Sequence, residues 1–161
     1  MWSDYLLLGI IGFGAQIVDG ALGMAFGTLS NAALLVMGVP PAQASAIVHT
    51  AEVFTTAGSA ASHIYHRNVD WRLVMRLGIA GVLGAIMGAW LLSNIDSRVG
   101  RPLIAGYLLI MGVLILLRAR RAFSPGPAPV RWLPLLGLGG GFLDASGGGG
   151  WGPMVTSTML S

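Results

Sequence analysis

The sequence contains no cysteine and no lysine, and charged residues make up only 9% of its 161 positions. Without cysteine, the chain has no disulfides, no thiolate metal sites and no cysteine nucleophiles. A soluble domain carries roughly 25% charged residues, so this low content argues against a soluble fold. All nine basic residues are arginines that lie between apolar runs or at their edges. That distribution fits membrane topology better than a nucleic-acid-binding face.

The sequence is rich in apolar residues. They make up 55% of the chain, and the mean hydropathy is +0.77. We therefore predict an integral, all-α membrane protein whose main partner is the lipid bilayer. The N-terminus has no basic region, and no cleavage site follows the first apolar run, so we interpret that run as a retained membrane segment and not as a signal peptide.

A glycine-rich motif that contains a single acid occurs twice. Residues 12–31 read GFGAQIVDGALGMAFGTLSN, and residues 137–156 read GLGGGFLDASGGGGWGPMVT. Laid over each other without a gap, the copies place Asp19 on Asp144, an offset of 125 residues that is typical of one half of a duplicated transporter. The other matches pair Gly12 with Gly137, Gly14 with Gly139, Gly23 with Gly148 and Gly27 with Gly152. An acid within an apolar run is costly, so each copy indicates a functional site.

The apolar runs predict a polytopic helical bundle with broken helices. A first four-helix repeat occupies residues 1–117, a charged Pro/Gly-rich linker follows at 118–131, and residues 132–161 begin a second repeat, with membrane segments at about 5–37, 42–65, 73–92 and 102–117. Because a duplicated protein would continue for three more membrane segments after the second copy, we expect a C-terminally truncated form or fragment. As a straight helix the first segment would be about 48 Å long, against about 30 Å for a bilayer core. It must therefore bend, tilt or break, and the glycines around Asp19 mark the place.

The second segment carries polar residues on one helical face. They recur every three or four positions, at Ser45, His49, Glu52, Thr56, Ser59, His63 and His66. On a membrane helix such a stripe should face the bundle interior or a wet cavity. His49 and Glu52 stand three residues apart and can touch. A proton relay and a structural hydrogen bond are both consistent with that spacing.

Three acids lie inside apolar runs without a basic partner, namely Asp19, Glu52 and Asp144. Burial without a cation favours the protonated form, which suits coupling to protons. The alternative is that each acid only hydrogen-bonds backbone groups freed at a helix break. Gly148, Gly149 and Gly152 predict unpaired N–H groups before a new helix, a place where anions bind. Close backbone packing is the alternative reading of these glycines.

The arginines also predict an orientation. The connections at residues 66–76 and 118–131 hold seven of the nine arginines, so they should be cytoplasmic, and those at 38–44 and 93–101 should be external. The course of the first segment stays open. A single broken crossing, which we favour, places the N-terminus inside and makes the copies parallel, whereas a re-entrant hairpin places it outside and makes them inverted.

At these residues the chain resembles the sulfite exporter TauE/SafE family of bacterial membrane permeases. The resemblance extends over nearly the whole chain, through GAQIVDG at 14–20 with Gly23, GVPPA at 38–42, AIVHTAEVFTT at 46–56, NVDW at 68–71, and GGFLDA at 140–145 through Gly152 and Pro153. It implies a location in the bacterial plasma membrane, about eight transmembrane helices from two four-helix repeats, and export of small sulfur-containing anions such as sulfite or organosulfonates. The early end of the sequence departs from that pattern.

Together these observations predict a secondary transporter of a small anion, with no metal, no cofactor and no nucleic-acid partner. Glu52, Asp19 and Asp144 would exchange protons or order the helix breaks, and the sequence leaves the substrate, the direction of transport and the coupling ion open. The residues expected to bind the anion or to couple its transport are Asp19, Gly23, Gly27, His49, Glu52, Thr56, Asp144, Gly148, Gly149 and Gly152. The alternatives are an intramembrane enzyme that uses His49 and Glu52 as an acid–base pair, and a non-transporting membrane scaffold. The sequence leaves the oligomeric state open.

Overall fold

The structure is a computed structural model that describes residues 2–119 and 132–159. Within those residues the chain is helical and contains no β-strand. The helices are α1 (Trp2–Leu22), α2 (Phe26–Val36), α3 (Pro41–Tyr65), α4 (Trp71–Asn94), α5 (Ser97–Ala119), α6 (Leu133–Gly147), the π-helical η2 (Trp151–Thr156) and α7 (Ser157–Met159). The predicted linker at 118–131 lies, from residue 120 onward, outside the described residues.

Three of these helices are long and apolar enough to cross a membrane, at Tyr5–Leu22, Trp71–Asn94 and Ser97–Leu117. Helix α3 has 25 residues but is not among them, because its polar face lowers its hydropathy. The prediction of an all-α membrane protein is confirmed.

The helix ends follow local sequence signals. Pro41 occupies the first position of α3, where its missing N–H removes no hydrogen bond. The side chain of Asp70 caps α4 by accepting hydrogen bonds from the backbone N–H groups of Arg72 (2.9 Å) and Leu73 (3.2 Å). Helix α5 begins earlier than the predicted segment at 102–117, with Pro102 inside it, because the arginines near its start do not stop the helix.

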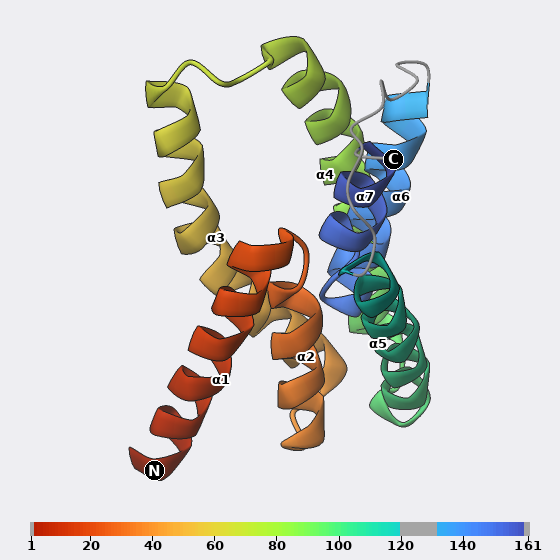
Figure 1. Ribbon diagram of the computed structural model, residues 1–161. Helices are drawn as coiled ribbons and strands as arrows, with labels where there is room; N and C mark the ends of the chain where they lie inside the picture. Colours follow the sequence, from red (N-terminus) through yellow and green to blue (C-terminus); the bar gives the residue numbers. More distant parts are fainter. Residues whose placement is uncertain (1, 120–131, 160–161) are drawn as a thin grey trace.

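We favoured a single broken crossing for the first segment, and the structure shows a different course. This segment folds as a hairpin: α1 rises to mid-height, and α2 returns toward the end of the molecule where the N-terminus lies (Figure 1). The pair formed by α6 and the η2–α7 segment also makes a hairpin, which opens toward the opposite end (Figure 1). The two copies of the motif thus run in opposite directions, and their tips meet near the middle of the molecule.

Helices α4 and α6 are in backbone contact. A Cβ atom added to Gly84 would fall on the carbonyl group of Leu138, and one added to Gly88 would fall on that of Phe142. From the other side, a Cβ atom at Gly141 would fall on the carbonyl of Gly81. Only glycine permits this approach. We call this contact the α4–α6 glycine seam; it fixes the second hairpin against α4.

Candidate functional site

The break between α1 and α2 and the break between α6 and η2 contain the same pair of hydrogen bonds, 125 residues apart in the sequence. Asp19 Oδ1 accepts from the backbone N–H of Ala25 (2.6 Å) and Phe26 (3.0 Å). Asp144 Oδ1 accepts from the N–H of Gly150 (2.8 Å) and Trp151 (2.9 Å), 125 residues further along in each case.

The backbone conformation repeats as well. Gly23 has φ +71° and Gly148 has φ +72°, a left-handed region that glycine enters without a steric penalty. Each of these glycines donates its N–H to the carbonyl of the aspartate four residues earlier, at 2.5 Å for Gly23 and 2.6 Å for Gly148.

Both aspartates therefore have a structural role, which is to accept hydrogen bonds from the backbone at the helix breaks. The first N–H groups of a helix have no partner within it, and the carboxylates supply acceptors for them at the starts of α2 and η2. Of the two roles weighed for these acids, hydrogen bonding to freed backbone groups is therefore present in both copies. The amide groups that the sequence led us to expect free for an anion are in part already occupied by the chain's own carboxylates.

The two breaks cross with their backbones in contact. A Cβ atom on Gly27 would lie 2.7 Å from the carbonyl oxygen of Gly148, and one on Gly152 would lie 2.7 Å from Cα of Met24. A Cβ atom on Gly149 would fall on Thr28, whose hydroxyl donates to the carbonyl of Gly149 (3.3 Å). Close packing thus accounts for these glycines, whether or not they also contact a solute.

Asn31 in α2 and Ser45 in α3 each form a hydrogen bond to the backbone of α6. The buried Asn31 donates its side-chain N–H to the carbonyl of Gly147 (2.6 Å), and the buried Ser45 donates its hydroxyl to the carbonyl of Ala145 (2.9 Å). Sequence reasoning did not select Asn31. Its position within the repeated motif was the available signal, but a lone amide in an apolar run carries no spacing pattern.

The polar face of α3 meets the second break at His49. His49 Nε2 lies 3.2 Å from the carbonyl oxygen of Asp144, and Nδ1 lies 2.9 Å from Glu52 Oε2. Because a carbonyl oxygen can only accept, Nε2 must carry a hydrogen. A hydrogen bond between Nδ1 and Glu52 then requires one more proton, held either by the ring or by the carboxyl group. The pair therefore stores one transferable proton between two partly exposed side chains.

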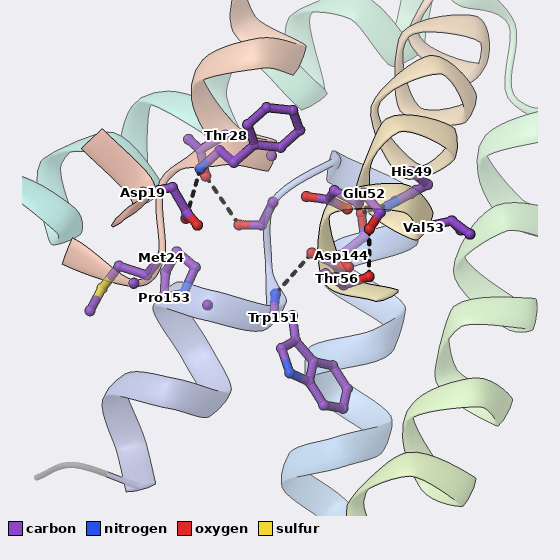
Figure 2. A pocket seen from close by; sticks show the side chains of 15 residues that line it. Asp19, Met24, Thr28, His49, Glu52, Val53, Thr56, Asp144, Trp151 and Pro153 are labelled. Carbon is purple, nitrogen blue, oxygen red and sulfur yellow. Dashed lines mark hydrogen bonds and ion pairs between the residues drawn. The ribbon is translucent and has the colours of Figure 1, made fainter. Parts of the chain in front are cut away.

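A cavity of about 420 Å³ lies where α3 and the two breaks converge, and Figure 2 shows its side chains. All the predicted site residues line it except Gly148, which packs on Asn31. The remaining lining residues are Met24, Phe26, Thr28, Val53, Trp151 and Pro153. The far end of the polar face, at Ser59, His63 and His66, is exposed and lies outside the cavity.

The two breaks contribute equivalent positions to this cavity. At the 125-residue offset, the lining residues pair as Asp19 with Asp144, Met24 with Gly149, Phe26 with Trp151, Gly27 with Gly152 and Thr28 with Pro153. Of the lining residues that sequence reasoning missed, only Met24 follows from the repeat, as the counterpart of Gly149, because Phe26 pairs with Trp151 and Thr28 with Pro153.

His49, Glu52 and Asp144 also have ligand atoms within 4.8 Å of one another, the spacing of a metal site. In the present arrangement both ring nitrogens of His49 are engaged in hydrogen bonds, so a metal ion would have to replace the proton between Nδ1 and Glu52.

Comparison with known proteins gives two matches. The family model described as sulfite exporter TauE/SafE matches residues 8–161. The chain is also 44% identical over 163 residues to the probable membrane transporter protein YtnM of Bacillus subtilis (strain 168). That match covers 97% of this chain and 54% of the relative, so the chain spans about half the length of the curated relative it matches. No solved structure matches the chain.

Both names indicate a membrane transporter and not an enzyme. With the three membrane-length helices, they support an integral protein of the bacterial plasma membrane, as predicted. Since the family model covers nearly all of the sequence, the chain belongs to the sulfite exporter TauE/SafE family.

Proposed function

We propose that this chain supplies the solute site of a proton-coupled transporter of small anions, with sulfite and organosulfonates as the substrate class. The description of the family names sulfite, and the name of the relative gives transport without a substrate. The observation that carries the proposal is the cavity, which is lined by equivalent residues of two oppositely directed helix breaks. Its volume of about 420 Å³ lies within the range of roughly 300–1,000 Å³ that small-molecule sites occupy.

The first turn of α2 offers donors for an anion. The N–H groups of Ala25 and Phe26 are taken by Asp19, whereas those of Gly27 and Thr28 have no acceptor within the described part of the chain. Both residues line the cavity. The positive end of a helix dipole adds to their attraction for a negative charge.

Charge balance explains why a proton should accompany the anion. No arginine lines the cavity, while three acids do. An anion that enters it is repelled unless the acids are neutralised, and the proton shared by His49 and Glu52 does this for one of them. Anion binding should therefore be strongest when the pair is protonated, and solute and proton should move together.

We further propose that the two copies of the motif are inverted repeats. Their matched hydrogen bonds, left-handed glycines and opposite directions support this relation. Inverted repeats with discontinuous helices are a recurrent architecture of secondary transporters, in which the substrate lies between the breaks.

Radiolabelled sulfite and a labelled organosulfonate provide the test in proteoliposomes. The assay is run on this chain and on the B. subtilis relative, because the chain spans about half of that protein. We expect flux that increases when a pH gradient is imposed and that is absent from empty liposomes. Equal flux with and without the gradient contradicts proton coupling, and absence of flux from both proteins favours the scaffold alternative.

A further inference from the structure

A second, apolar groove runs between α5 and the α1–α2 hairpin, with a volume of about 650 Å³. Along α5 it is lined by residues from Arg101 to Leu116, and on the other side by the end of α1 and by α2. Apart from Thr28 and Arg101, every residue that lines it is apolar. Several of these side chains are exposed, with Val36 at 89% and Leu109 at 70% of their full accessible surface. We call this the α2–α5 groove.

Arg101 also lines a second, smaller cavity. That cavity has a volume of about 280 Å³ and lies between the end of α2 and the start of α5, lined by Gly38, Pro40, Pro41, Ser97, Arg98, Arg101 and Pro102. No acidic residue lines either space. Arg98 does have a carboxylate close by, since Asp96 Oδ1 accepts from its backbone N–H (2.7 Å), whereas the guanidinium group of Arg101 has no carboxylate partner among the described residues.

Arg101 is held at the junction by the end of α2. Its Nη2 donates to the carbonyl oxygens of Leu35 (3.4 Å) and Val39 (3.5 Å). A guanidinium group has five N–H donors, and within the described residues the donors on Nη1 and Nε have no acceptor. The group is therefore positioned by backbone and retains donors for an anion.

We propose that the α2–α5 groove binds an anionic phospholipid, with an acyl chain along the groove and the phosphate between Arg98 and Arg101. A long apolar channel that ends at two cations matches a molecule with an apolar tail and a negative head. Lipid is also the solvent of these helices, and a guanidinium group pairs directly with phosphate oxygens at either face of the membrane.

Native mass spectrometry of the purified chain tests the charge recognition, with phosphatidylglycerol and phosphatidylcholine of identical acyl chains as probes. Phosphatidylglycerol should bind more tightly. Arg101→Gln should weaken its binding about fivefold, the effect of one basic residue near an acidic headgroup. It should weaken phosphatidylcholine less, because the choline cation of that lipid offsets the charge of its phosphate. Arg101→Lys should retain most of the preference. Arg76→Gln, which removes a charge outside both cavities, is the control and should have no effect.

Two glycines of α5 test the apolar part. A Cβ atom at Gly112 or at Gly106 meets nothing within 4 Å, but only Gly112 lines the groove. Gly112→Leu should fill the space and reduce binding of both lipids, whereas Gly106→Leu should not. Equal binding of the two lipids by the unmodified chain overturns the proposal, as does unchanged binding by Gly112→Leu. Circular dichroism confirms that each variant is folded. Because the probes are lipids and no solute flux is measured, this outcome is independent of the transport proposal.

Discussion

At the scale of single residues, the proton shared by His49 and Glu52 is the most informative feature of the cavity. The carbonyl of Asp144 fixes the hydrogen on Nε2, so only the proton between Nδ1 and Glu52 can be exchanged. Loss of that proton would leave a lone pair facing a carboxylate at 2.9 Å, a repulsive arrangement. The pair should therefore separate when it is deprotonated, which links proton release to a change of geometry in the cavity.

Substitution of Glu52 by Gln should abolish proton-coupled sulfite flux. Gln retains the size and a donor toward His49 Nδ1, but it cannot release a proton. Insertion in the membrane and thermal stability in detergent should remain near those of the unmodified chain. Ser59→Ala, on the same face of α3 but outside the cavity, serves as the control and should transport normally. Unchanged flux in Glu52→Gln would remove this residue from the coupling mechanism.

Asp144 permits a second test, which separates structural support from proton exchange. Asp144→Ala leaves the N–H groups of Gly150 and Trp151 without their acceptor, so stability should fall by roughly 1–3 kcal/mol. Asp144→Asn retains an acceptor oxygen and should be much less affected. Thermal melts of both variants in detergent measure this difference, and equal stability of the two variants argues against the structural role. If the Asn variant is stable and still transports, Asp144 is not a proton carrier.

The sequence was enough to predict the acids and glycines at the helix breaks. It was not enough to predict that the carboxylates of these acids accept hydrogen bonds from the backbone N–H groups there. A lone acid in an apolar run is visible in the sequence at Asp19 and at Asp144. That each side chain bonds to amides six and seven residues later depends on the sharp turn at Gly23 or Gly148. Residue spacing alone could not distinguish free amides from amides held by the chain's own carboxylate.

At the scale of helices, the α4–α6 glycine seam should tolerate no added side chain. Gly84→Ala places a methyl group on the carbonyl of Leu138, and overpacking of this kind costs about 1–3 kcal/mol. Gly78→Ala in the same helix meets nothing within 4 Å, so it should be neutral or slightly stabilising. Thermal melts of the two variants provide the comparison. A Gly84→Ala variant as stable as Gly78→Ala would show that the backbones do not touch.

The helices were easier to predict than their directions. Apolar runs and proline or glycine signals locate α3 and α4 within a few residues. The hairpin of α1 and α2 was one of two courses that the sequence left open, and it was not the favoured one, because Asp19 and its glycines mark a break without giving the angle of the turn. The two helices separate at Gly23, whose positive φ reverses the chain, and a positive φ at glycine is not visible in the sequence.

At the scale of the whole molecule, the hairpins predict which connections share a side of the membrane. The start of α1 and the link between α4 and α5 lie at one end, and the loop between α3 and α4 lies at the other (Figure 1). Since the chain has no cysteine, single-cysteine variants can be labelled without background. Trp2→Cys and Ser97→Cys should react with an impermeant thiol reagent from one side, and Asn68→Cys from the other. By the distribution of arginines, the side of Asn68 is the cytoplasm. Labelling of Trp2→Cys and Asn68→Cys from the same side contradicts the hairpin.

The glycine seam also bears on how the molecule can move. Where two backbones touch with no side chains between them, no change of rotamer can let one slide past the other, so α4 and α6 should travel as one rigid body. Helix α1 is largely uncovered, with 6% of its membrane-length window buried, whereas α2 is held against the second break by the contacts of Gly27 and Thr28. Alternation of access should then come from a swing of α1 about the turn at Gly23, with α2 staying in place. Spin labels at Trp90 and Leu135 should keep their separation when sulfite is added, whereas a pair at Ile10 and Leu135 should not.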